Sequence, residues 1–229
     1  MSFTGFGDDF FGFFHELKNN NNRDWFNENK ERYKQVVVEP VTAFITDIAP
    51  RLHNITPHYK ADPRPNGGSM FRIYRDARFA KGEPYKTHAG IQFRHKLGKD
   101  AHAPGYYFHL EEGNIKYGAG VWTPPTAILT QIRERVQYYG DKWQAVLDDD
   151  AFKKHYGQIL GDGLKRAPRG FSEDLEHIVD IKRKSYFLMK PIDTMALVGS
   201  RDFLDEVTEG MEAATPFMQF ISDALDIEF

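Results

Sequence analysis

The residues best suited to chemistry lie close together in one short stretch of the chain. A guanidinium group presents a flat fork of donors that binds carboxylate or phosphate oxygens two at a time, and it stays charged when partly buried. Arginines at the spacing Arg-x-x-Arg-Asp-x-Arg, followed by a lysine, therefore predict a site for a phosphorylated or carboxylated small molecule. The predicted ligand-binding residues are Arg72, Arg75, Arg78 and Lys86, and the candidate catalytic residues, each able to move a proton, are Asp76, Tyr85 and His88.

A second interpretation of the same stretch is structural. Asp76 could itself be the anion, in an internal network with the arginines that pins a strand to a turn, while Tyr74 and Tyr85 stack on guanidinium planes. Residues 64–99 carry nine basic residues against two acidic ones, although the whole chain has a net charge of −3. One aspartate does not neutralise that excess, so the ligand pocket and the structural network both stay open.

Composition and motifs narrow the remaining chemistry. The chain has 229 residues and no cysteine, which excludes disulfides, thiolate metal sites and a cysteine nucleophile. The nine histidines do not occur in a metal-binding spacing such as His-Glu-x-x-His, and the phosphate-loop, dinucleotide-binding and serine-elbow motifs are also missing. We therefore expect no metal and no cofactor. His88 and His109 fall near predicted strand ends and are further candidates for a general base.

Two other classes of function compete with a small-molecule site, and whether the protein is an enzyme stays open. A nucleic-acid-binding module would use aromatic rings to stack bases beside the arginines, but a pI near 6.3 counts against it. A protein-binding module would use an aromatic patch at residues 122–125. The rings considered for base stacking are Tyr74, Phe79, Tyr85, Tyr106 and Tyr107.

Hydrophobic periodicity predicts the elements that position these residues. Apolar residues at helical spacing predict a helix over residues 8–18, ended by asparagines at 19–22, and further helices over the segment that follows. Alternation of apolar and charged residues predicts a strand over 70–76, and strands are also predicted over 89–95, 105–110, 114–121 and 185–189. Paired prolines at 124–125 predict a helix start, and the acidic C-terminal part reads as two amphipathic helices.

These elements predict one α+β domain over residues 1–229. We expect a mostly antiparallel sheet of about five or six strands, with N-terminal helices on one face and the C-terminal helices packed alongside. The arginine-rich segment should lie at the edge or mouth of that sheet. The sequence has no apolar run long enough to span a membrane and no signal-peptide pattern at its start, so we expect a cytoplasmic protein with no membrane partner.

Several motifs resemble an uncharacterised domain-of-unknown-function family found in bacteria and fungi. The most specific is Phe-Arg-Ile-Tyr-Arg-Asp-x-Arg-Phe at residues 71–79, followed by Pro-Tyr-Lys-Thr-His at 84–88. Supporting segments are Gly-Tyr-Tyr-x-His-Leu at 105–110, Gly-x-Gly-x-Trp-x-Pro at 118–124 and Leu-Lys-Arg-x-Pro-x-Gly-Phe at 164–171. The resemblance runs from the first helix to about residue 189. It implies a shared fold of roughly this length and no assigned activity.

Overall fold

The centre of the molecule is an antiparallel sheet, seen in a computed structural model that describes residues 2–76, 78, 82–97 and 104–229. Its five strands follow one another in space as they do in sequence, and every neighbouring pair is antiparallel. The predicted α+β class is therefore confirmed. The strands are β1 (Tyr59–Lys60), β2 (Ala89–His95), β3 (Gly105–Leu110), β4 (Ile115–Val121) and β5 (Tyr186–Ile192).

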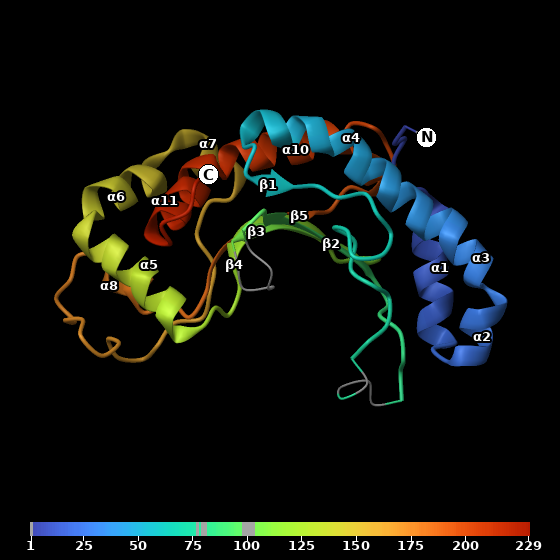
Figure 1. The fold of residues 1–229 in the computed structure, drawn as a ribbon, viewed down its shortest axis with the longest axis horizontal. Helices are drawn as coiled ribbons and strands as arrows, with labels where there is room; N and C mark the ends of the chain where they lie inside the picture. The colour runs from blue at the N-terminus through green and yellow to red at the C-terminus, as the bar shows by residue number, and fades with distance from the viewer. Residues whose placement is uncertain (1, 77, 79–81, 98–103) are drawn as a thin grey trace.

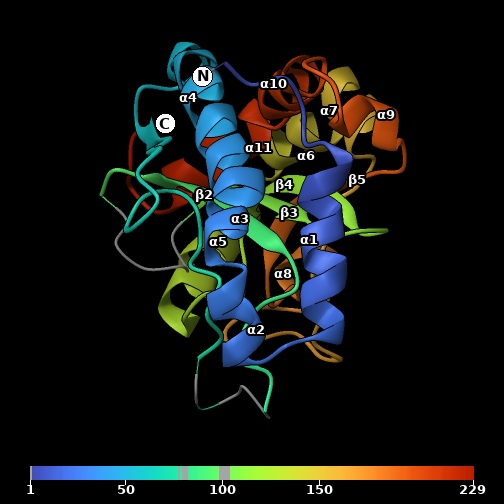
Figure 2. The same ribbon diagram turned by 90° about the vertical axis from the view of Figure 1, so that its right-hand side faces the viewer.

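Helices cover one face of this sheet and both of its ends (Figure 1). On the covered face, α4 and α10 pack against each other, and the ring of Phe44 in α4 lies 5.4 Å from that of Phe108 in β3. Figure 2 faces one end of the molecule, where α1 and α2 lie in front of the sheet. The helices are α1 (Asp8–Asn19), α2 (Arg23–Glu28), α3 (Lys30–Tyr33), α4 (Glu39–Ile55), α5 (Thr126–Tyr138), α6 (Gly140–Asp148), α7 (Asp150–His155), α8 (Ile178–Ile181), α9 (Met195–Val198), α10 (Phe203–Ala213) and α11 (Thr215–Ala224), with a π-helical turn at Lys34–Val38.

Local sequence explains the first helices. The buried face of α1 carries phenylalanines at helical spacing behind Asp8 and Asp9, whose charges suit a helix N-terminus. Asn20 ends α1, and the side chain of Asn22 accepts a hydrogen bond from the backbone of Trp25 to cap α2. The predicted asparagine break between two helices is thus present.

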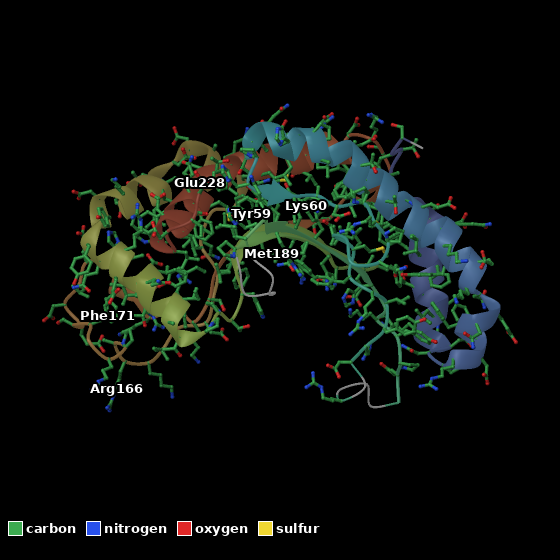
Figure 3. All side chains as sticks on the ribbon, in the orientation of Figure 1. Tyr59, Lys60, Arg166, Phe171, Met189 and Glu228 are labelled. Atoms are coloured by element: carbon green, nitrogen blue, oxygen red, sulfur yellow. The ribbon has the colours of Figure 1, made fainter. Side chains whose placement is uncertain are left out.

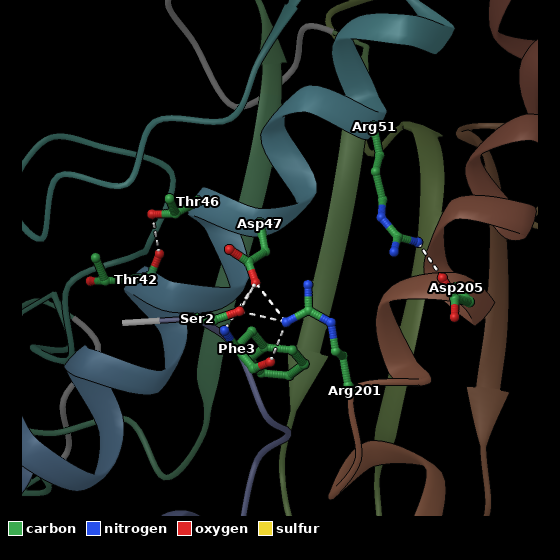
Figure 4. A network of polar contacts seen from close by, with 8 residues as sticks. All are labelled: Ser2, Phe3, Thr42, Thr46, Asp47, Arg51, Arg201 and Asp205. Atoms are coloured by element: carbon green, nitrogen blue, oxygen red, sulfur yellow. Dashed lines mark hydrogen bonds and ion pairs between the residues drawn. The ribbon is translucent and has the colours of Figure 1, made fainter.

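Polar contacts fix α4 to the segments around it (Figure 4). Arg201 donates to the carboxylate of Asp47 at 3.2 Å and to the carbonyl of Phe3 at 3.0 Å. Arg51, one turn along α4, pairs with Asp205 of α10. These contacts tie the N-terminal residues and α10 to the helix that covers the sheet.

The arginine-rich segment departs from the regular strand predicted over residues 70–76. It forms only isolated bridges, from Met70 to Ile91 and from Tyr74 to Tyr85. Backbone hydrogen bonds from Phe71 to Gly90 and from Lys86 to Ile73 continue the pairing as an irregular hairpin, which we call the arginine hairpin (residues 70–88, of which 77 and 79–81 lie outside the described residues). The hairpin extends from the β2 edge, as Figure 1 shows.

One further property bears on membrane association. Among the described residues, no helix combines the length and the apolar composition needed to cross a bilayer.

Candidate functional site

The sheet face opposite α4 and α10, which we call the open face, carries a cavity of about 640 Å³. This size is typical of small-molecule sites. Met189, labelled in Figure 3, lies on the strand at one side of it. The side chains and glycines that line the cavity include Phe71, Gln92, Gly105, Tyr107, His109, Lys116, Gly118, Gly120, Trp122, Leu160, Phe187 and Met189.

Strand register places these residues in ordered rows. Neighbouring strands are about 4.8 Å apart, and residues two apart on one strand are about 7 Å apart. Rows across β2, β3, β4 and β5 therefore describe the open face as a grid. The first row is Gly90, His109, Lys116 and Pro191, the second is Gln92, Tyr107, Gly118 and Met189, and the third is Arg94, Gly105, Gly120 and Phe187.

Three adjacent glycines form the floor of the cavity. Gly105 and Gly120 pair across β3 and β4, and Gly118 lies next to them. Gly120 has a φ of 126°, a backbone conformation that residues other than glycine rarely adopt. A Cβ on Gly118 would lie only 1.8 Å from the carbonyl oxygen of Leu188. The backbone therefore requires glycine there, and the missing side chains leave a hollow.

The third-row end of the cavity is apolar. The rings of Trp122 and Phe187 meet edge to face, with centroids 4.8 Å apart. Trp122 is 60% exposed, and Leu160 and Met189 complete this wall. An apolar ring or chain could bury surface here.

The first-row end is polar, and its groups form a hydrogen-bonded chain. The hydroxyl of Tyr107 lies 3.0 Å from Nδ1 of His109, whose Nε2 lies 3.1 Å from Glu111. Asn114 donates to the same Glu111 oxygen at 3.0 Å. A tyrosine, a histidine and a carboxylate in series are able to relay a proton to or from a molecule in the cavity.

Burial shapes the acid–base behaviour of this chain. It raises the pKa of Tyr107, with Glu111 adding to the effect, so the phenol is protonated at neutral pH. Burial opposes ionisation of Glu111, but hydrogen bonds from His109 and Asn114 prevail and its pKa is lowered. His88 lies against His109 with ring centroids 4.3 Å apart. Burial and that neighbour lower the pKa of His88 to about 4.

Three cations in or near the cavity form no ion pair with a carboxylate among the described residues. For Lys116, half-buried in the lining, the described residues offer no ion pair or hydrogen bond to Nζ. Phe71 carries Lys86 on its ring at 5.6 Å and Arg94 at 5.7 Å. Lys86 donates to the carbonyl of Arg72, and burial followed by the nearby Arg72 charge lowers its pKa.

Of the residues predicted to form the site, Arg75 and Tyr85 hold the arginine hairpin together. Arg75 donates through Nε to the carbonyl of Tyr85 at 2.8 Å and pairs with Glu83 at 3.1 Å. The ring of Tyr85 is buried and stacks on Phe26 with centroids 4.1 Å apart. Asn21 binds both backbone polar groups of Tyr85.

Arg78 and Asp76 pair with each other near the hairpin tip. The guanidinium contacts both carboxylate oxygens, the shortest distance being 2.6 Å, and these hydrogen bonds lower the pKa of Asp76 to about 2. Both side chains are exposed. Arg72 is also exposed on the hairpin.

The structure thus divides the predicted set. Lys86 and His88 contact the lining residues Phe71 and His109, whereas Arg75 and Arg78 form ion pairs within the hairpin. That all of them bind one ligand stays a prediction. Sequence reasoning did not single out Lys116 or the glycine floor, although a lysine and two glycines at every second position of β4 could have indicated an unfilled face.

The described residues contain no group of three histidine or acidic side chains positioned to hold a metal ion. Two of the rings considered for base stacking differ from expectation. Tyr85 and Tyr106 are 3% and 1% exposed, so neither presents a face for a base. Phe79 lies outside the described residues.

The fold and site define a class: an α+β protein whose antiparallel sheet is covered by helices on one face and bears a cavity on the other. The sequence matches DUF2461, described as a conserved hypothetical protein family, over residues 9–220. The chain belongs to this family, which agrees with the resemblance seen in its motifs. A comparison with curated proteins finds no match.

Proposed function

We propose that this protein binds a carboxylated or phosphorylated small molecule in the cavity on the open face. The observation that carries the proposal is Lys116, a half-buried cation in the lining for which the described residues offer no carboxylate. Partly burying an ammonium group without a counter-charge is unfavourable. An anionic ligand would supply the missing charge.

The surrounding charges support the same ligand. Arg94 and Lys86 flank Phe71, and neither forms an ion pair with an acid among the described residues. The nearby acid, Glu111, is held by His109 and Asn114. The field in the cavity is therefore positive, which favours anions and speeds their approach.

The hydrogen-bonded chain of Tyr107, His109 and Glu111 makes an enzyme possible as well as a binder. With Nε2 of His109 donating to Glu111, Nδ1 can accept a proton, so Tyr107 could pass its proton to the histidine while it takes one from the bound molecule. The same groups would orient a ligand with no reaction. Turnover of an identified ligand, lost in Tyr107→Phe, would decide for the enzyme.

The arginine hairpin is the alternative location for the anion, since Arg72 is exposed there beside Lys86. A nucleic-acid or protein-binding role is the competing class. We extend the proposal to a cytoplasmic location because the cysteine-free sequence needs no oxidising compartment. Cell fractionation tests that location.

A thermal-shift screen of phosphorylated metabolites, nucleotides, carboxylates and short single-stranded RNA tests the proposal. A ligand at a hundred times its dissociation constant adds about 2.7 kcal/mol, or roughly 5–10 °C for a domain of this size. We expect Lys116→Met to abolish the shift and Arg72→Met to keep it. A shift lost only in Arg72→Met would place the anion on the hairpin, and a response to RNA alone would favour the nucleic-acid class.

A further inference from the structure

The two ends of the cavity differ in chemistry, and this difference specifies the ligand further. We infer that the ligand is a planar heteroaromatic ring joined by a short tether to an anionic group. The ring lies on the glycine floor against Phe187 and Trp122, and the anion lies at Lys116. This inference rests on the proposed function and names the chemical class that the same cavity takes.

The ring position follows from the shape of the floor. Gly105, Gly118 and Gly120 are neighbours in the strand register, so an area of backbone without side chains lies on the open face. Trp122 and Phe187 form an aromatic wall beside it, and their rings pack edge to face with centroids 4.8 Å apart. A planar ring fits this hollow, because it covers backbone with one face and meets the wall with its edge.

A polar donor above the floor selects a ring with acceptor atoms. Gln92 uses its Oε1 to accept from Arg94 at 2.9 Å, which turns its Nε2 the other way. That Nε2 lies 3.6 Å from the position that a Cβ on Gly105 would occupy. An amide N–H group thus stands over the floor, where a ring nitrogen or carbonyl oxygen could accept its hydrogen bond.

The distance between the two ends sets the tether. Lys116 is two residues from Gly118 on β4, so the backbone positions differ by about 7 Å. A ring whose charged group sits on a tether of a few bonds spans that distance. Nucleoside monophosphates and heteroaryl carboxylates share this chemistry, whereas inorganic phosphate or a sugar phosphate would leave the aromatic end empty.

The experiment compares ligands with and without the ring on the full chain. Isothermal titration would use adenosine and cytidine 5′-monophosphates, 3-pyridylacetate, ribose 5-phosphate and inorganic phosphate. We expect at least one ring-bearing anion to bind tenfold or more tightly than ribose 5-phosphate. The nucleotide and carboxylate arms then distinguish the two sources of the ring.

Variants separate this inference from the proposed function. Trp122→Ala and Met189→Ala should remove the advantage of the ring and leave the affinity for ribose 5-phosphate unchanged, while Lys116→Met should weaken every anion. Tyr138→Ala, which removes a 73% exposed ring from α5, is the matched control, and melting temperatures confirm that each variant folds. Ribose 5-phosphate binding as tightly as the nucleotides, with dependence on Lys116, would overturn the ring and keep the anion site. No binding by any anion would overturn both.

Discussion

The side-chain amide of Asn21 pairs with both backbone polar groups of Tyr85. Its Nδ2 donates to the carbonyl oxygen at 3.0 Å, and its Oδ1 accepts from the amide at 3.0 Å. Arg75 donates to the same carbonyl at 2.8 Å. The asparagine thus acts as a neighbouring strand would, and it joins the loop between α1 and α2 to the arginine hairpin that flanks the cavity.

Asn21→Ala should destabilise the protein by about 2–3 kcal/mol. It removes two hydrogen bonds, each worth about 1 kcal/mol, and leaves the amide of Tyr85 without its partner. Thermal or urea denaturation would measure the loss. Asn20→Ala is the control, because the side chain of Asn20 donates to the carbonyl of Glu16 at the end of α1. Equal losses of stability in the two variants would show that the hydrogen bonds between Asn21 and Tyr85 stabilise the fold no more than the single bond of Asn20 does.

Arg75 should prove to be a structural residue of the hairpin. Arg75→Met removes a charged donor from the Tyr85 carbonyl and the ion pair with Glu83, and we expect a cost of about 1–2 kcal/mol. Arg72→Met, at an exposed position of the same hairpin, should cost less than half as much. The urea concentrations at the unfolding midpoints of the two variants give the comparison. A larger loss of stability in Arg72→Met than in Arg75→Met would restore Arg75 to the predicted ligand-binding residues.

Stability should fall in mildly acidic solution because of His88. Its pKa is lowered from 6.5 to about 4 by burial and by His109, so the unfolded chain binds the proton more readily than the folded one. The contribution of neutral His88 is therefore complete above pH 6.5 and declines as the pH falls toward 4. At about 1.4 kcal/mol per pKa unit, its effect is about 3 kcal/mol at most.

His88→Asn isolates that contribution from other acid-sensitive groups. We expect its melting temperature to depend less on pH between 6.5 and 4 than that of the natural protein, whereas His53→Asn, at an exposed position on α4, should follow the natural curve. Parallel curves for His88→Asn and the natural protein would mean that protonation of His88 does not lower the stability of the folded protein.

Glu111→Gln should strengthen anion binding. Glu111 is the acid beside the polar end of the cavity, and removing a like charge near the bound anion should gain under about 1 kcal/mol, or about three- to fourfold in affinity. Glu112→Gln, whose carboxylate pairs with the exposed His15, is the control one residue away. Titration of an identified ligand would show the difference, and weaker binding in Glu111→Gln would assign the carboxylate a direct role in holding the ligand.

The sequence predicts the sheet well because its signals are local. Alternation in β2 and β3 gives both strands with their observed bounds, and it separates the buried Tyr106 and Phe108 from Tyr107 and His109 on the open face. The asparagine break between α1 and α2 is equally local. Periodicity is sufficient where each residue needs only its neighbours along the chain.

The site is harder to predict because its residues come together only through register. Lys116, Tyr107 and Phe187 lie on three different strands, and each alone reads as an ordinary strand residue. The arginines gave a strong signal that proved ambiguous, since Glu83 and the Tyr85 carbonyl, partners of Arg75, are set by the turn geometry. The charge count identified the cationic region but not which cations were already paired.

The most direct test of a ligand site on the open face is to map binding by two-dimensional ¹H–¹⁵N NMR with the best anion from the screen. We predict that the amide signals of Gly118, Gly120 and Lys116 shift with increasing ligand, while those of Arg72 and Arg75 stay in place. Saturable shifts confined to residues 72–88, with the glycine floor unchanged, would contradict it and assign the anion to the arginine hairpin.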